Sequence, residues 1–113
     1  MLNKKYRFHS RGGVRYTYQN GKTIRTPKIS LVYNKNGRGF QRFAVVVSKK
    51  VLKSAVGRNR IRRRVYEAIR LELPNFQRAQ DSIFVVYNKE IKDLPFDELR
   101  ALVRTLLEES IVS

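Results

Sequence analysis

The apolar residues of this chain fall into short runs that predict three strands. Residues 29–33 (ISLVY) read as a strand, and Pro27 precedes it at a place where the missing N–H does little harm. Residues 42–48 (RFAVVVS) and 82–88 (SIFVVYN) are nearly continuous apolar runs, as expected for strands buried on both faces. The Gly-rich residues 34–41 are expected to form a turn between the first two strands.

Between the second and third strands the apolar period changes to that of a helix. The apolar positions lie on one stripe, at i, i+4, i+7 and i+8: Ile61, Val65, Ala68 and Ile69. Ser54 is the expected N-cap of this helix, and Pro74 is expected to stop it. A strand, a helix and a strand at this spacing form a βαβ unit, so the strands at 42–48 and 82–88 should be parallel.

A second helix is predicted over about residues 95–111. Its apolar stripe contains six residues: Phe96, Leu99, Leu102, Val103, Leu106 and Leu107. Asp97 and Glu98 lie in its first turn, where the helix dipole favours acidic side chains. The remaining charges are mixed, so this helix is expected to be core material.

Residues 9–21 (HSRGGVRYTYQNG) fit two patterns. Ser10 could cap a helix that carries Val14 and Tyr18 on one face and ends at Gly21 in the left-handed conformation. A strand is also compatible, because apolar or aromatic residues alternate after the two glycines and an Asn-Gly pair is typical of a hairpin. The two glycines would cost about 1 kcal/mol each inside a helix. Periodicity leaves the choice open.

The charge of the chain is distributed unevenly. The 113 residues carry a net charge of +16, yet residues 1–66 contain 19 Lys and Arg and no acid, whereas residues 67–113 contain 6 basic and 9 acidic residues. This asymmetry predicts one domain with a nucleic-acid-facing side. Residues 1–8 are expected to form a flexible or extended basic arm. The sequence has no cysteine and no apolar run near the ~18 residues of a membrane span, so we expect a cytoplasmic protein.

Residues 49–70 hold the densest positive charge, with Glu67 as their one acid. Opposite the apolar stripe, the helix carries Asn59, Arg60, Arg62, Arg63, Tyr66 and Arg70. Guanidinium groups fork to phosphate oxygens, and a polyanion relieves their mutual repulsion by releasing counterions. A membrane surface would need apolar anchors on the same helix face. RNA is favoured over duplex DNA, because Asn59 can hydrogen-bond an unpaired base and the tyrosines can stack on bases.

Protein-only catalysis is not expected from these residues. The single histidine, His9, has no Ser, Cys or metal-ligand cluster at a useful spacing. The carboxylates of residues 90–98 and 108–109 resemble helix-start and solvent positions rather than a general acid and base. No phosphate-cradling Gly-x-x-x-x-Gly-Lys pattern is present.

Residues 43–70, FAVVVSKKVLKSAVGRNRIRRRVYEAIR, resemble the signature of the bacterial ribonuclease P protein component, with Arg58-Asn59-Arg60 at its centre. The segment RFHS…YQNGKTIR near the start agrees more loosely. The resemblance implies an α+β, two-layer sandwich in the order helix, three strands, helix, strand, helix, which makes residues 9–21 a helix. It also implies a left-handed crossover between the parallel strands, against a right-handed default of about 98%.

The resemblance further implies a function. The family binds a catalytic RNA and assists removal of the 5′ leader from precursor tRNA, so both RNAs are the expected partners, without a membrane or an obligate protein partner. The RNA carries out the chemistry with Mg²⁺, and the protein alone binds no cofactor. The alternative from composition is a structural RNA-binding protein, such as a ribosomal protein or an RNA chaperone.

Two sets of site residues carry over by position. The expected contacts to the catalytic RNA are Lys49, Lys50, Lys53, Arg58, Asn59, Arg60, Arg62, Arg63 and Arg70. The expected leader-binding cleft contains Tyr18 and either Ser30 with Val32 or Ile29, Leu31 and Tyr33, depending on which sheet face is wet. Gly57 departs from the family pattern, in which a larger residue usually stands at this helix position.

Overall fold

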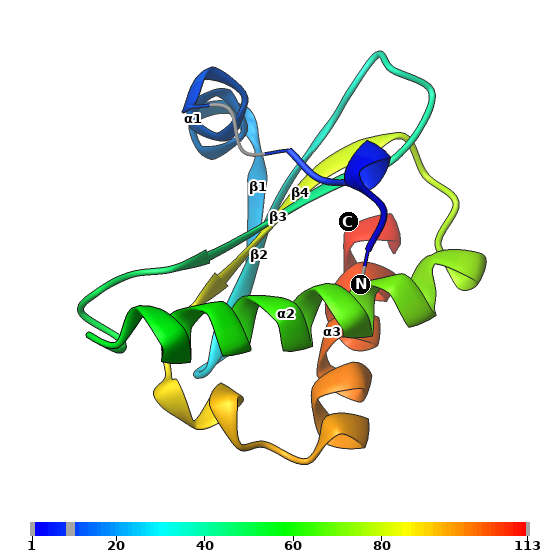
Figure 1. Ribbon diagram of the computed structural model, residues 1–113. Helices are drawn as coiled ribbons and strands as arrows, with labels where there is room; N and C mark the ends of the chain where they lie inside the picture. The colour runs from blue at the N-terminus through cyan, green and yellow to red at the C-terminus, as the bar shows by residue number, and fades with distance from the viewer. Residues whose placement is uncertain (1, 9–10, 113) are drawn as a thin grey trace.

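A four-stranded sheet organises the computed structural model, which describes residues 2–8 and 11–112. The helices and strands run in this order: α1 (Arg11–Asn20), β1 (Lys22–Arg25), β2 (Ile29–Lys35), β3 (Arg42–Val47), α2 (Ala55–Glu72), β4 (Gln80–Val86) and α3 (Phe96–Val112) (Figure 1). Three short 3₁₀ turns lie at Lys4–Tyr6, Leu73–Asn75 and Lys89–Lys92. The order confirms the α+β fold predicted from the sequence. Within these residues, no helix combines the length and the apolar character that a membrane span requires.

The strands are arranged β1-β2-β4-β3 across the sheet. β2 pairs antiparallel with β1 and with β4, whereas β3 pairs parallel with β4, in a register that places Ala44 opposite Ile83. The parallel pair confirms the predicted βαβ unit. The order of three strands before α2 is also confirmed, although residue pattern alone does not locate β1.

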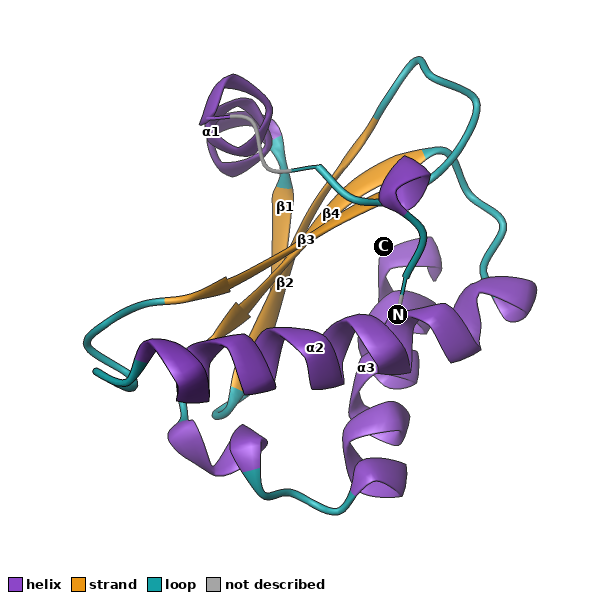
Figure 2. Cartoon of the chain, in the orientation of Figure 1, coloured by secondary structure: helices purple, strands orange, loops and turns teal. Residues whose placement is uncertain are grey.

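Alternate residues of each strand face opposite sides of the sheet. Ile29, Leu31 and Tyr33 of β2 pack in the larger core beneath α2 and α3. Val32 packs on the other face with Phe8, Ala44 and Ile83, in a smaller cluster that also receives Val14 of α1. Figure 2 shows α2 and α3 together on one side of the strands and α1 on the other.

Local signals place α2 as predicted. The Ser54 hydroxyl caps the helix by accepting a hydrogen bond from the Gly57 N–H at 3.1 Å. The four predicted stripe residues, Ile61, Val65, Ala68 and Ile69, are each 0% exposed. Pro74 lies in the 3₁₀ turn that follows the helix. Gly57 is buried. The side chain of Leu52 occupies the space that a larger residue at this position would need.

Residues 11–20 form a helix, so the alternative of a strand is excluded. Ser10, the expected cap, lies outside the described residues. The expectation that Gly21 adopts the left-handed conformation is wrong, since Gly39 alone has a positive φ among the described residues. Gly21 is instead placed by close approach, because a Cβ there would lie 2.6 Å from the carbonyl oxygens of both Thr17 and Tyr33.

The expected N-terminal arm lies along the outer edge of β3. Leu2 is 2% exposed within the larger core, and Phe8 is 4% exposed in the smaller cluster on the other face. Between them, Arg7 forms an isolated parallel bridge with Phe43, and the Phe8 N–H donates to the Phe43 carbonyl at 2.9 Å. We call residues 2–8 the N-terminal strap, because they cross the sheet edge from one core cluster to the other.

Candidate nucleic-acid interface

Most of the predicted RNA contacts are open to solvent along the basic helix and the loop before it. Seven of the nine are exposed: Lys49, Lys50, Lys53, Asn59, Arg60, Arg63 and Arg70. The helix is anchored through its buried stripe, so this surface is held in position by the core. We call these seven residues the basic face. Glu67 is the one acid within residues 49–70, which contain the basic face.

Arg58, at the centre of the family-like motif, is partly buried and engaged with the chain itself. One of its terminal nitrogens, Nη1, donates to the carbonyls of Leu52 at 2.9 Å and Lys53 at 2.7 Å. These bonds tie the loop before α2 to the first turns of the helix. Arg58 therefore orients the lysines of this loop relative to Arg60 and Arg63.

Arg64 also has a structural role, and the sequence analysis did not place it among the RNA contacts. Its guanidinium donates to the carbonyls of Ile91 and Leu94, which precede α3. Burial lowers the pKa of the Arg64 guanidinium, and the neighbouring charge of Arg60 lowers it further. This arginine joins α2 to the connection that leads into α3.

Arg70 closes the basic face with an intrahelical ion pair. Its Nε donates to the Glu67 carboxylate at 2.7 Å. The hydrogen bond from Arg70 lowers the pKa of the Glu67 carboxyl, although partial burial opposes this. Arg70 therefore brings less uncompensated charge to the face than Arg60 or Arg63.

Tyr66 lies elsewhere than predicted. Helical periodicity assigned it to the polar face, yet it is only 8% exposed and belongs to the larger core. The guanidinium of Arg7 lies over its ring, 5.8 Å from the ring centroid. Burial raises the pKa of the Tyr66 hydroxyl, while a hydrogen bond with the backbone of Val45 and the charges of Arg7 and Arg62 oppose this. A helical projection omits the N-terminal strap, which is what covers Tyr66.

A hollow of about 520 Å³ opens where the strap, β3 and α2 meet. Its lining combines cationic, amide and apolar side chains: Arg7, Val45, Val56, Asn59, Arg62, Arg63 and Tyr66. Arg62 donates to the Oδ1 atom of Asn59 across one turn of the helix. Asn59, Arg62 and Arg63 were predicted site residues, whereas Arg7, Val45 and Val56 were not. Val56, at 76% exposed, is an apolar residue on a basic surface, and this contrast was visible in the sequence.

The second predicted site lies on the sheet face that carries α1. Tyr18 is 44% exposed there, and burial together with the nearby Tyr87 raises the pKa of its hydroxyl. Ser30 and Val32 lie on this same face, but at 0% and 5% exposed they form its buried floor. Their side chains do not reach the surface. Tyr87, at 45% exposed, is the accessible neighbour of Tyr18 that the sequence analysis did not assign to this site.

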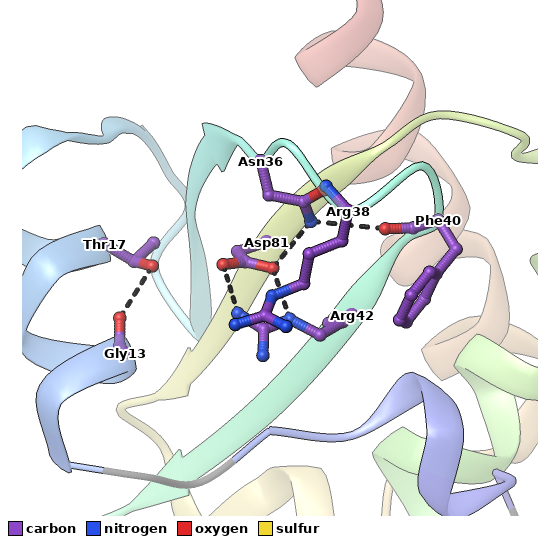
Figure 3. A network of polar contacts seen from close by, with 7 residues as sticks. All are labelled: Gly13, Thr17, Asn36, Arg38, Phe40, Arg42 and Asp81. Atoms are coloured by element: carbon purple, nitrogen blue, oxygen red, sulfur yellow. Dashed lines mark hydrogen bonds and ion pairs between the residues drawn. The ribbon is translucent and has the colours of Figure 1, made fainter.

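A polar network holds the turn between β2 and β3 (Figure 3). Asp81 of β4 accepts hydrogen bonds from Arg42 on β3 and, at 2.8 Å, from the side chain of Asn36. Asn36 also donates to the Phe40 carbonyl at 3.2 Å and accepts from the Arg38 N–H at 3.0 Å. The turn therefore presents exposed Arg38 from a fixed backbone.

The two buried carboxylates in the described ranges, Glu72 and Asp81, both pair with arginines. Glu72 is 1% exposed and accepts hydrogen bonds from Arg100 at 2.6 Å and Arg104 at 2.9 Å, which joins α2 to α3. Across residues 2–8 and 11–112, no cluster of three or more His, Cys, Asp or Glu side chains is arranged to hold a metal ion. His9 lies outside these ranges.

Comparison with known proteins adds sequence and structural relatives. The family model described as "Ribonuclease P" matches residues 2–110. The ribonuclease P protein component of Chloroflexus aurantiacus is 35% identical over 109 residues, which cover 96% of this chain and 80% of the relative. That of Caldanaerobacter subterraneus is 37% identical over 93 residues, covering 82% and 78%.

Solved structures support the same architecture. The RNase P protein from Thermotoga maritima matches with a TM-score of 0.82 at 23% identity, over 91% of this chain and 96% of that one. The Staphylococcus aureus RNase P protein matches with a TM-score of 0.79 at 22% identity, over 93% and 94%. At these identities the structural matches establish the fold.

Proposed function

Because the chain belongs to the ribonuclease P protein family, we propose that its basic face binds the catalytic RNA of that endoribonuclease. The chain is a protein component of ribonuclease P, which removes the 5′ leader from precursor tRNA. The family match covers residues 2–110, nearly the whole chain. The observation that supports this best is that seven predicted contact residues are exposed along an anchored helix and the loop before it. Such a surface suits the phosphate backbone of a folded RNA.

In this proposal the RNA performs the chemistry, and the protein helps to position the RNA. Mg²⁺ held by the RNA would stabilise the charge that develops at the scissile phosphate. The chain's own contribution is electrostatic and geometric. Arg58 orients the loop before α2, which carries the lysines, and Arg60 and Arg63 contact phosphates. We place this assembly in the cytoplasm, with precursor tRNA as the second RNA partner.

The face beside α1 is proposed to bind the single-stranded leader. Tyr18 and Tyr87 are both exposed there, and Tyr87 lies close enough to add to the raised pKa of the Tyr18 hydroxyl. Stacking on aromatic rings suits single-stranded bases of any sequence, since every base has a π-face. Ser30 and Val32 would support this surface from below rather than contact the leader.

Reconstitution tests the proposal directly. The protein is added to a bacterial ribonuclease P RNA at low Mg²⁺, and cleavage of a precursor tRNA is followed with RNA alone and protein alone as controls. We expect leader removal at the mature 5′ end only when both components are present. If the mixture cleaves the precursor tRNA no better than the RNA alone, the structural RNA-binding alternative is favoured. Cleavage by the protein alone would indicate a protein-only nuclease.

A further inference from the structure

The hollow between the strap, β3 and α2 brings together arginines that are far apart in the sequence. Arg7 comes from the strap, and Arg62 and Arg63 come from α2. Its volume of about 520 Å³ lies in the range of sites that bind small ligands. The described residues place no acid in its lining. An anionic ligand is therefore favoured.

Arg7 supplies a second, independent indication of a ligand. Its Nε atom is buried and has no hydrogen-bond partner among the described residues. A buried donor without an acceptor bears its desolvation penalty uncompensated, and native proteins rarely leave one unsatisfied. The stacking of this guanidinium on Tyr66 fixes its position but leaves its Nε–H without an acceptor. A phosphate oxygen is the acceptor that arginine recognises best.

The apolar part of the lining distinguishes a nucleotide from a bare anion. Val56 is 76% exposed at the start of a helix whose other open residues are largely basic or polar. Together with Val45 and Tyr66 it provides an apolar wall beside the arginines. A ribose and a base can pack against such a wall, whereas inorganic phosphate gains nothing from it. The Asn59 amide, whose oxygen is held by Arg62, can donate to a base edge.

We propose that this hollow holds one unpaired nucleotide of the bound RNA, with its phosphate on Arg7 and Arg63 and its base against Val45 and Val56. This inference rests on the proposed function, because it assumes that α2 faces RNA. It adds to that function a specific pocket and a role for the strap. A paired base could not enter, since its edge and both faces are occupied within the duplex.

The test uses the full-length protein and the four nucleoside 5′-monophosphates as probes, followed by amide chemical shifts in NMR. We expect saturable shifts at Val45, Val56 and Arg63, and affinity at least about fivefold weaker for ribose 5-phosphate and inorganic phosphate. Equal affinity for phosphate alone would overturn the nucleotide assignment. Shifts spread over all basic surfaces, or equally strong binding of a polyglutamate peptide, would overturn the pocket.

Two variants and one matched control locate the site. Val56→Glu should weaken mononucleotide binding by about tenfold or more through repulsion of the phosphate. It should keep the fold, since the position is exposed and an acid in the first turn of a helix is favourable. Arg7→Ala should weaken binding similarly. Arg60→Ala, on the same helix but outside the hollow, should leave mononucleotide affinity unchanged while weakening binding of the catalytic RNA. Unchanged affinity in Val56→Glu would refute the pocket.

The two proposals fail in different ways. If the wild-type protein does not bind the catalytic RNA, the proposed function fails whatever the mononucleotides do. If it binds the catalytic RNA tightly but the mononucleotide shifts do not map to the hollow, only the pocket fails.

Discussion

The guanidinium of Arg42 and the carboxylate of Asp81 form two parallel hydrogen bonds, Nε to Oδ1 at 2.9 Å and Nη2 to Oδ2 at 2.7 Å. The two residues are direct partners in the register of β3 and β4, and their side chains are only 16% and 12% exposed. Arg42 also lies over the ring of Phe8 at 4.7 Å. One acid thus joins two parallel strands and, through Arg42, the strap.

Replacing Asp81 by Asn should lower the free energy of unfolding by about 2 kcal/mol, because Arg42 would remain largely buried without its counter-charge. Urea denaturation measures this change. Asp97→Asn is the control, since Asp97 is exposed in the first turn of α3 and should cost only a few tenths of a kcal/mol. Equal, small losses in both variants would contradict a stabilising role for the Arg42–Asp81 pair.

Substitution by alanine should change the stability of the fold in opposite directions at Gly12, within α1, and at Gly21, directly after it. Gly21→Ala should destabilise the fold by about 2 kcal/mol, because its Cβ would meet two backbone oxygens at 2.6 Å. Gly12→Ala should stabilise it by about 0.5–1 kcal/mol, since its Cβ meets nothing within 4 Å and alanine favours a helix. Thermal unfolding of both variants checks this. Stabilisation by Gly21→Ala would refute the close approach.

The arginines of α2 should separate into RNA-binding and structural groups. The double variant Arg60→Ala with Arg63→Ala should weaken binding of the catalytic RNA and reduce the slope of log affinity against log salt by about one for each lost phosphate contact. Filter binding across salt concentrations measures the slope. Arg64→Ala should instead leave the slope unchanged and destabilise the fold by about 1–2 kcal/mol, because it loses two carbonyl contacts. An unchanged slope in the double variant would argue against this face.

Tyr18→Ala should reduce affinity for leader-bearing precursor tRNA more than affinity for mature tRNA. One stacked base is worth about 1–3 kcal/mol, so a loss of roughly fivefold or more is expected for the precursor alone. The measurement is a comparison of dissociation constants for the reconstituted complex with the two tRNAs. Tyr16→Ala is a matched control, because Tyr16 is 60% exposed on the same helix and is not assigned to the leader site. Equal losses for both tRNAs would remove Tyr18 from that site.

Stability should decline in acid partly through Glu72. The hydrogen bond from Arg104 lowers the pKa of the Glu72 carboxyl, burial opposes this, and the bond from Arg100 adds to the lowering. Because the folded pKa lies below the unfolded one, the ionised carboxylate stabilises the fold above the ordinary value of 4.5, and this contribution is lost as the pH falls through the folded pKa. Glu72→Gln should therefore be less stable at pH 7 and show a flatter decline below about pH 4.5. Parallel pH profiles for the two proteins would contradict this.

Local patterns in the sequence were sufficient for most of the elements. The strands predicted at 29–33, 42–48 and 82–88 correspond to β2, β3 and β4, although the ends of the strands differ by one or two residues. These strands and the two long helices follow from apolar period, caps and breakers, which act within a few residues. Residues 9–21 stayed ambiguous because two glycines and an Asn-Gly pair compete with a helical stripe. The packing of Val14 against the sheet, a contact between distant segments, supports the helix.

The sequence by itself determined that one helix would bury an aliphatic stripe and present arginines on its other side, because both follow from the period of a single helix. Only the tertiary structure decided what each arginine does. The guanidinium of Arg64 donates to carbonyls 27 and 30 residues away along the chain. The side chain of Arg7 lies over the ring of Tyr66 from the strap at the edge of β3. Such contacts depend on how separate segments are brought together in space, and no local periodicity encodes them.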